Sequence, residues 1–155
     1  MTAELDAYDR KILSELQKDA TVSQNELGAR VNLSAAAVNR RIRRLTEVGA
    51  IMQCTAVVAP AAVGYGLSII VNVEVESEQI DLLDRMKRTF AKCPQVQQCY
   101  YVAGEWDFVL VLAVKDMEQY NSLTRTLFFG DNNVKRFKTL VAMDRVKVGL
   151  ALPIE

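Results

Sequence analysis

The apolar residues of this chain change their spacing partway along its length, and this change constrains the fold more than any other feature. Residues 1–50 follow helical spacing, with Ile12 and Leu16 on one side of the first segment. Residues 67–75, LSIIVNVEV, instead alternate between apolar and polar side chains, as a half-buried strand does. The chain therefore predicts a helical part followed by a part that contains a sheet.

The second part alternates strands and helices in the order β-α-β-β-α-β, which is typical of a ferredoxin-like fold. Strands are predicted at 67–75, 96–102, 108–114 and 134–148, helices at 79–93 and 116–129, and a turn at 130–133. Helices cover one face of such a sheet. The other face is rich in apolar residues here, so we expect it to pack against a second copy and form a dimer.

The predicted fold class is α+β, with three domain-level segments. Residues 1–50 are expected to form a helical domain, and residues 67–155 a ferredoxin-like βαββαβ domain. Between them, residues 51–66 are expected to hold a connecting strand at 51–58 and a linker at 59–66, where APAAVGYG has one Pro and two Gly.

Composition excludes several classes of protein. The 155 residues include 19 basic and 19 acidic side chains, so no net charge favours indiscriminate coating of nucleic acid or membrane. The chain has no His, which removes the commonest general base and metal ligand, and we expect no catalytic or metal site. Three Cys without C-x-x-C spacing indicate reduced thiols, and no segment resembles a signal peptide or membrane span, so we expect a cytoplasmic protein with no membrane partner.

Residues 23–49 have the signals of two helices joined by a short turn. Ser23 and Glu26 have the spacing of a capping box at the start of the first helix. Asn32 is suited to the turn because Asn tolerates a left-handed backbone. Ser34 is the expected cap of the second helix and Gly49 its end. This spacing predicts a helix-turn-helix.

The second of these helices carries four Arg between positions 40 and 44, and residues 29–46 contain no acidic residue. Helical geometry places Arg40 and Arg43 opposite the core, where they and Asn39 would read base edges. Arg41 and Arg44 are expected to hold phosphates. The alternative is a solvated surface helix. The predicted DNA-binding residues are Ser23, Gln24, Ser34, Ala35, Ala36, Asn39, Arg40, Arg41, Arg43 and Arg44.

The sequence resembles the Lrp/AsnC (feast/famine) transcription regulators over essentially its whole length. It has their L-D-x-x-D-x-x-I-L-x-x-L-Q-x-D start at 5–19, E-L-x-x-x-V-x-L-S at 26–34 and R-x-x-x-L-x-x-x-G-x-I at 41–51. It also has V-x-G-x-x-D-[FY] at 102–108 and D-M-x-x-Y at 116–120. Many relatives have an acidic residue near position 40, so Arg40 implies a different operator sequence.

The resemblance implies a helix-turn-helix DNA-binding domain of winged-helix-like type at residues 1–50. It also implies dimers through the second (RAM) domain, often assembled to octamers, and an amino-acid effector bound between neighbouring dimers. Within the turn at 103–107, Gly104 would expose backbone amides to a carboxylate and Asp107 would hold an ammonium group. The same turn also fits an ordinary hairpin. The predicted effector-binding residues are Tyr101, Gly104, Glu105, Trp106, Asp107, Phe137 and Thr139.

The predicted function is a sequence-specific DNA-binding transcriptional regulator of amino-acid metabolism whose DNA binding or assembly responds to a small effector. Its expected partners are double-stranded DNA, further copies of itself and an amino acid, with no cofactor. One alternative is a DNA-architectural protein without an effector. The other is a small ferredoxin-like enzyme, which the absence of His and of a recognisable nucleophile–base pair disfavours.

Overall fold

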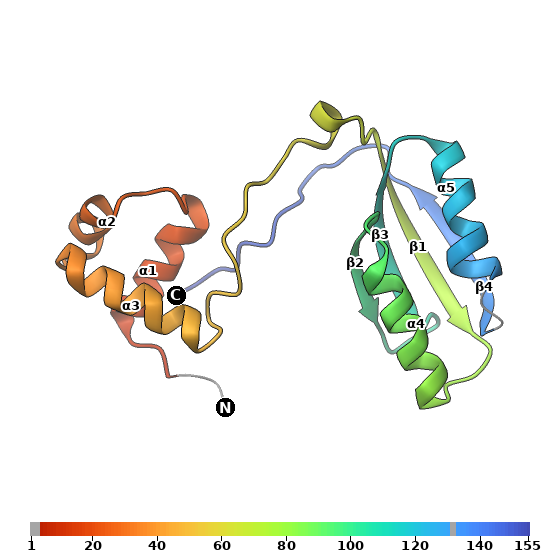
Figure 1. Ribbon diagram of the computed structural model, residues 1–155, viewed down its shortest axis with the longest axis horizontal. Coiled ribbons are helices and arrows are strands. Elements are labelled where there is room, and N and C mark those ends of the chain that lie inside the picture. Colours follow the sequence, from red (N-terminus) through yellow and green to blue (C-terminus); the bar gives the residue numbers. More distant parts are fainter. Residues whose placement is uncertain (1–3, 131–132) are drawn as a thin grey trace. The chain divides into compact units, whose positions relative to one another are not determined.

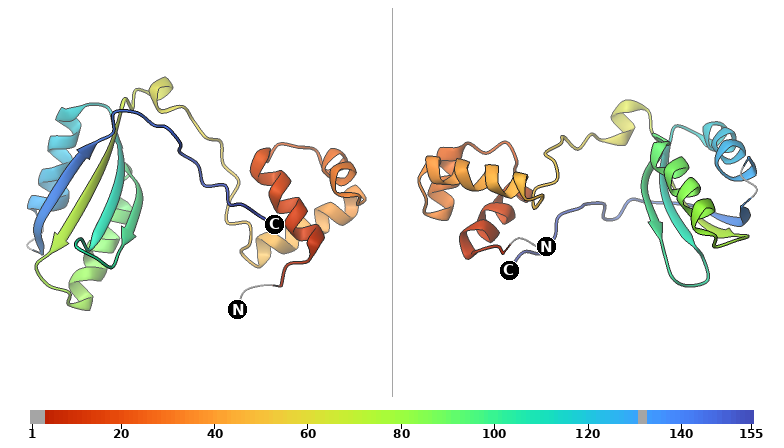
Figure 2. Two further views of the ribbon diagram at one scale, coloured as in Figure 1. Left: turned by 180° about the vertical axis from the view of Figure 1, so that it is seen from behind. Right: turned by 60° about the horizontal axis from the view of Figure 1, so that its bottom comes forward.

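The computed structural model describes residues 4–130 and 133–155. The chain divides into two compact units (Figures 1 and 2), which we call the helical unit, residues 1–57 with 148–155, and the sheet unit, residues 58–147. The predicted turn at 130–133 therefore lies partly outside the described residues. No helix within the described ranges is long and apolar enough to cross a membrane.

In residues 4–57 and 148–155, the described part of the helical unit, the helices are α1 (Ala7–Lys18), α2 (Gln24–Val31) and α3 (Ala35–Glu47). Each begins at the predicted cap, since the side chains of Asp6, Ser23 and Ser34 each accept a backbone N–H from the first turn. The three helices bury one shared apolar cluster, whose fully enclosed members are Ile12, Leu27, Val31, Val38 and Leu45.

The last residues of the chain pack with the helical unit, although the sequence assigned them to the second domain. Gln17 of α1 makes two hydrogen bonds to the backbone of Leu152. Its side-chain amide donates to the carbonyl at 3.0 Å, and its side-chain oxygen accepts the N–H at 2.7 Å. Ile154 is half-buried there. A terminal segment without regular structure is thus tied down by one side chain.

The sheet unit has the predicted β-α-β-β-α-β order. Its elements are β1 (Leu67–Val75), α4 (Ile80–Lys92), β2 (Val96–Tyr101), β3 (Phe108–Val114), α5 (Met117–Thr124) and β4 (Val134–Val141), preceded by a short 3-10 helix η1 (Pro60–Val63). The strands are antiparallel in the order β2-β3-β1-β4. Both helices lie on the same face of the sheet (Figures 1 and 2), and the other face is open.

The core of this unit lies between the helices and the sheet. Alternate residues of β1 and β3 point into it, as the period of two predicted. Phe90 of α4 meets Phe108 of β3 edge to face, with 5.4 Å between ring centroids. Both rings are at most 1% exposed. The core therefore ties α4 to a central strand.

Of the predicted strands, one is absent and one is shorter than expected. Residues 51–58 form no strand, because a strand needs a neighbour for its backbone groups and no described segment pairs with them. The last strand ends at Val141 rather than at 148. Its pairing partner β1 begins at Leu67, only two residues beyond the pair of Ile69 with Val141, so a strand that reached 148 would outrun its partner. The helix predicted to reach 129 does so, but Arg125–Phe129 is π-helical.

Candidate DNA-binding surface and effector site

The turn between α2 and α3 sets the position of the recognition helix. Asn32 adopts a left-handed conformation with φ 57°, as expected, and its N–H caps α2 at the Gly28 carbonyl. Gly28 lies so close to the turn that a Cβ there would be 2.5 Å from the Leu33 carbonyl oxygen. Gly28 was not among the residues predicted from the sequence, although a Gly inside a short helix is a signal of close backbone approach.

Helix α3 divides into the predicted faces. Val38 and Leu45 are fully buried. Asn39, Arg40 and Arg43 are exposed on the other side. Neither of these two Arg forms an ion pair with another residue in the part of the chain that the structure describes. Their guanidinium groups are therefore available to an external acceptor.

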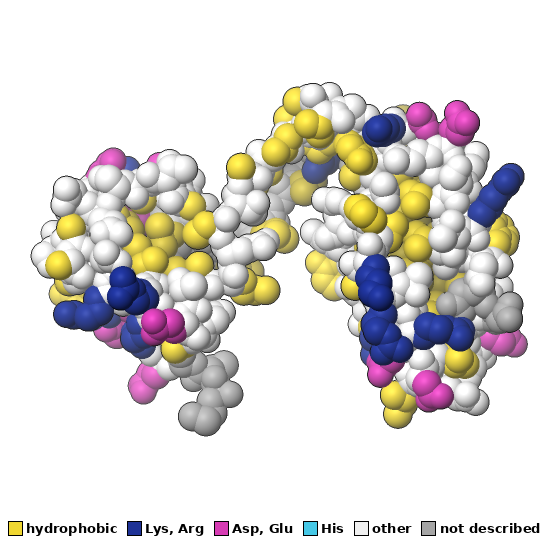
Figure 3. Space-filling view, viewed as in Figure 1, with side chains coloured by type: hydrophobic (Ala, Val, Ile, Leu, Met, Phe, Trp, Pro, Cys, Tyr) yellow, Lys and Arg dark blue, Asp and Glu magenta, His cyan; other side chains and the backbone are white. Residues whose placement is uncertain are grey.

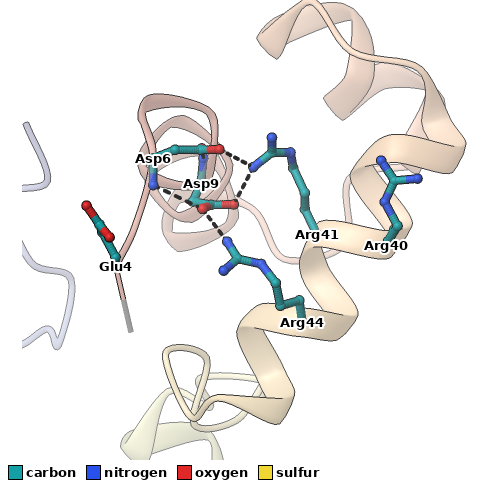
Figure 4. Close-up of a pocket in the computed structure, with 6 residues that line it drawn as sticks. All are labelled: Glu4, Asp6, Asp9, Arg40, Arg41 and Arg44. Atoms are coloured by element: carbon teal, nitrogen blue, oxygen red, sulfur yellow. Dashed lines mark hydrogen bonds and ion pairs between the residues drawn. The ribbon is translucent and has the colours of Figure 1, made fainter. Parts of the chain in front are cut away.

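Arg41 and Arg44 have a different environment from the one that the sequence predicted. Nη1 of Arg41 donates to Asp6 at 2.7 Å and to Asp9 at 2.8 Å, and Nη2 of Arg44 donates to the other oxygen of Asp9. Figure 4 shows both side chains directed toward the two carboxylates at the start of α1, whereas Arg40 lines the same pocket without an ion pair to either of them. Both arginines thus pair within the unit, and their expected role as phosphate holders stays a prediction.

The two carboxylates also form a complete capping box, because each accepts the backbone N–H of the other. Burial alone would raise the pKa of Asp9, but hydrogen bonds from Arg44 and Arg41 outweigh it and hold this pKa below its ordinary value. The backbone N–H of Asp9, followed by Arg41, lowers the pKa of Asp6. Both groups therefore stay ionised at neutral pH and hold the two arginines.

The capping box predicted at Ser23 is only half present. Ser23 Oγ accepts the N–H of Glu26 at 3.2 Å, but the Glu26 carboxylate instead pairs with Arg30 at 2.6 Å. Gln24 begins α2, and the small Ala35 and Ala36 begin α3 beside their cap, Ser34.

In the space-filling view, basic side chains of the helical unit lie directly beside acidic ones (Figure 3). The basic surface is therefore partly neutralised from within.

The turn at 102–107 is fastened to the end of β1. The Asp107 carboxylate accepts the N–H of Val75 at 2.7 Å. The backbone N–H of Asp107 donates to the Val73 carbonyl at 2.9 Å. One oxygen predicted to hold a ligand's ammonium group thus already has a backbone partner. Gly104 has a φ of 153° and is exposed, so it suits the turn as predicted.

Arg136 of β4 organises the surface beside this turn and was not among the residues predicted from the sequence. Its guanidinium lies 4.8 Å from the ring of Trp106 and 3.6 Å from Glu105, and it also pairs with Glu74. Lys135 donates to the same Glu74 at 2.7 Å. These two basic residues hold the pKa of Glu74 below its ordinary value. The ion pair follows from the register, since Glu74 lies opposite Arg136 across the sheet.

The seven predicted effector residues do not come together in one chain. Tyr101 lies on β2 and packs against Phe108, whereas Phe137 and Thr139 lie on β4. These are the two edge strands, about 14 Å apart across three strand spacings. Thr139 shares a hydrogen bond with Tyr120 of α5, and Phe137 packs against the π-helical turn. Both face the helices rather than the turn.

Each of the two parts of the chain matches a known protein family. Residues 68–152 match the family described as the Lrp/AsnC ligand binding domain, and residues 5–52 match a winged helix-turn-helix DNA-binding family. The chain belongs to the Lrp/AsnC family of transcriptional regulators. It is a transcriptional regulator with a DNA-binding helix-turn-helix. Members of this family are regulators and not enzymes.

Named members of the Lrp/AsnC family resemble the chain over nearly its full length. An uncharacterised HTH-type regulator of Sinorhizobium fredii is 41% identical over 152 residues, covering 98% of this chain and 90% of that protein. The leucine-responsive regulatory protein of Escherichia coli is 33% identical, covering 98% and 93%. The solved structure of a Neisseria meningitidis regulator in complex with L-Met has a TM-score of 0.89, 27% identity and 97% coverage of both chains.

Proposed function

We propose that this chain is a sequence-specific DNA-binding regulator in the cytoplasm. In this proposal it controls genes of amino-acid metabolism, and an amino acid changes its DNA binding or its assembly. The observation that carries the DNA part is the exposed side of α3, where Asn39, Arg40 and Arg43 stand opposite the buried core residues. Arg suits guanine edges and Asn suits adenine, so this side is chemically matched to the major groove.

The start of each helix supports a docking role for the same unit. Ala35 and Ala36 leave room for a close approach to DNA. Ser23 and Ser34 each use the hydroxyl oxygen as an acceptor for a backbone N–H, which leaves the hydroxyl proton free to donate to a phosphate. Gln24 adds a side-chain amide beside the first of these caps. Such contacts orient a protein on DNA without specifying sequence.

An amino acid is the proposed effector class. The names of two relatives mention leucine response and an L-Met complex, which makes these two amino acids the first probes. In this proposal the turn residues Gly104, Glu105, Trp106 and Asp107 supply one wall of the site, and a neighbouring copy of the chain supplies the rest. The wide separation of Tyr101 from the β4 residues is the reason for invoking a second copy.

The open face of the sheet is the proposed dimer interface. Ile70, Val109, Val111 and Leu140 share this face, because Ile70 pairs with Val111 on one side and with Leu140 on the other. Leu140 is 43% exposed in the single chain. A second copy would remove this apolar band from water. Octamers are the assembly expected beyond the dimer, and sedimentation measures the size directly.

The DNA proposal is tested by selecting an operator from random duplexes and measuring its affinity by fluorescence anisotropy. Arg40→Ala and Arg43→Ala should each weaken operator binding, and loss of one bidentate base contact corresponds to about 1–3 kcal/mol. Lys115→Ala is a matched control, since it removes a positive charge from the sheet unit. Unchanged operator affinity in both Arg variants contradicts the assigned reading face.

The effector proposal is tested on the full chain with the twenty amino acids, starting with L-leucine and L-methionine. A ligand that binds the folded protein alone raises its unfolding temperature, and at one hundred times its Kd it adds about 2.7 kcal/mol. Active amino acids are then added to the operator titration and to sedimentation runs. If no amino acid changes unfolding temperature, affinity or size, the protein is a DNA-architectural one instead.

A further inference from the structure

The four arginines of α3 fall into two pairs with different partners. Arg40 and Arg43 are exposed and form no ion pair with any described residue. Arg41 and Arg44 both reach across to α1, where Asp9 receives one of them on each carboxylate oxygen. Asp9 is 0% exposed, so this carboxylate has no access to water.

A buried carboxylate holds its basic partners firmly. Removing one partner leaves an uncompensated charge in a poorly solvated place, which proteins avoid strongly. Asp6 adds to the restraint, since Arg41 Nη1 lies 2.7 Å from Asp6 and 2.8 Å from Asp9. The side chain of Arg41 is also only 24% exposed. Swinging it outward to follow a phosphate would break both pairs at once.

We propose that Asp9 and Asp6 set the specificity of DNA binding by withholding Arg41 and Arg44 from the phosphate backbone. Phosphate contacts strengthen binding to every sequence, whereas base contacts favour the operator alone. Two restrained arginines beside two free ones therefore raise the share of binding energy that depends on sequence. The inference rests on the proposed function, because it concerns the same helix on the same DNA.

The main test replaces Asp9 with Asn, which keeps the shape and removes the charge. Affinity is measured for the selected operator and for a random duplex over a range of salt concentrations. Release of one Arg to a phosphate steepens the slope of log K against log salt by about 0.9, which corresponds to about eightfold tighter random-duplex binding at 0.1 M salt. The affinity for the operator increases less than this, because α3 is held less firmly. The ratio of operator affinity to random-duplex affinity therefore falls.

A second variant keeps the test decisive if Asp9→Asn does not fold. Asp6 is 51% exposed, and Asn is as good a helix cap as Asp, so Asp6→Asn preserves α1 while it weakens the hold on Arg41. Asp6→Asn should steepen the salt slope and lower the ratio of operator to random-duplex affinity, both by less than Asp9→Asn does. Glu118→Gln is the matched control, since it removes one negative charge from an exposed position of α5 in the sheet unit.

Arg41→Ala separates the proposal from the sequence-based expectation. An Arg that touches no phosphate leaves the salt slope unchanged when it is removed, so we expect a slope equal to that of the parent. A slope lower by about 0.9 means that Arg41 holds a phosphate, and this overturns the proposal. Equal weakening on operator and random DNA in Asp9→Asn and Asp6→Asn, without a steeper slope, assigns the carboxylates a purely structural role and also overturns it. Failure of the parent to prefer any operator instead refutes the proposed function.

Discussion

Gly28 is the position where one added methyl group should disturb the helix-turn-helix most directly. A Cβ at this site would lie 2.5 Å from the Leu33 carbonyl oxygen, well inside the 3.4 Å at which ordinary van der Waals contact begins. The obstructing atom is backbone, and the same carbonyl region leads directly into α3, with Ala35 N only 3.5 Å away. No side-chain rotation relieves the contact, so the turn itself must move.

Two opposing terms determine the expected stability of Gly28→Ala. The change from Gly to Ala in a helix interior favours folding by about 1 kcal/mol. Overpacking typically costs about 1–3 kcal/mol, and a rigid backbone obstacle belongs at the upper end of that range. We therefore expect the free energy of unfolding of the helical unit to fall by about 1–2 kcal/mol. This loss corresponds to a decrease in Tm of about 5–15 °C for a unit of this size.

The measurement is thermal and urea unfolding of the full chain followed by far-UV circular dichroism. Gly149→Ala is the control, because a Cβ at Gly149 meets nothing within 4 Å, and its stability should change by less than about 0.5 kcal/mol. A Gly28→Ala protein as stable as the parent, or more stable, would refute the reasoning, because helix propensity would then outweigh the close approach of the turn.

Two further predictions concern carboxylates. The folded-state pKa values of Asp6 and Asp9 are lowered, so their stabilisation is complete above the unfolded value of about 3.9 and is lost as the pH falls through the folded values. Acid titration of stability should therefore show a steep loss below about pH 4 that Asp9→Asn reduces, and an equal loss in both proteins contradicts this assignment. Asp107→Ala removes the acceptor of the Val75 N–H and should cost about 1–3 kcal/mol in urea unfolding. Asp116→Ala removes only an exposed helix cap worth about 1 kcal/mol. If Asp107→Ala lowers the free energy of unfolding by no more than Asp116→Ala does, the stabilising role of the Asp107 hydrogen bond is contradicted.

Local signals predicted much of the fold because each arises within a few residues. The bounds of β1 and β3 follow from alternation and from a continuous apolar run, and the structure has them at the predicted residues. The caps at Ser23 and Ser34 and the left-handed Asn32 were predicted because these side chains act on their own neighbouring backbone. The faces of α3 follow equally from the helical repeat.

The contacts that the sequence did not reveal join residues far apart in the chain. Asp9 lies 32 residues before Arg41 and 35 before Arg44, so no local pattern links them. Asp9 looks like any acidic residue in a first helical turn. The effector set was dispersed for a similar reason, since only the strand order places β2 and β4 at opposite edges of the sheet. The missing strand at 51–58 had the right composition but no neighbour to pair with.

The hydrogen bonds between Gln17 and Leu152 give the chain an unusual connectivity. Residues 1–57 and 148–155 belong to one unit and residues 58–147 to the other, so the sheet unit is an insertion within the helical unit. The helical unit is therefore not a contiguous stretch of sequence, and a fragment ending at residue 57 lacks one of this unit's segments. Each end of the inserted unit continues into the helical unit. A tag fused after Glu155 is consequently attached to the helical unit and not to the sheet unit.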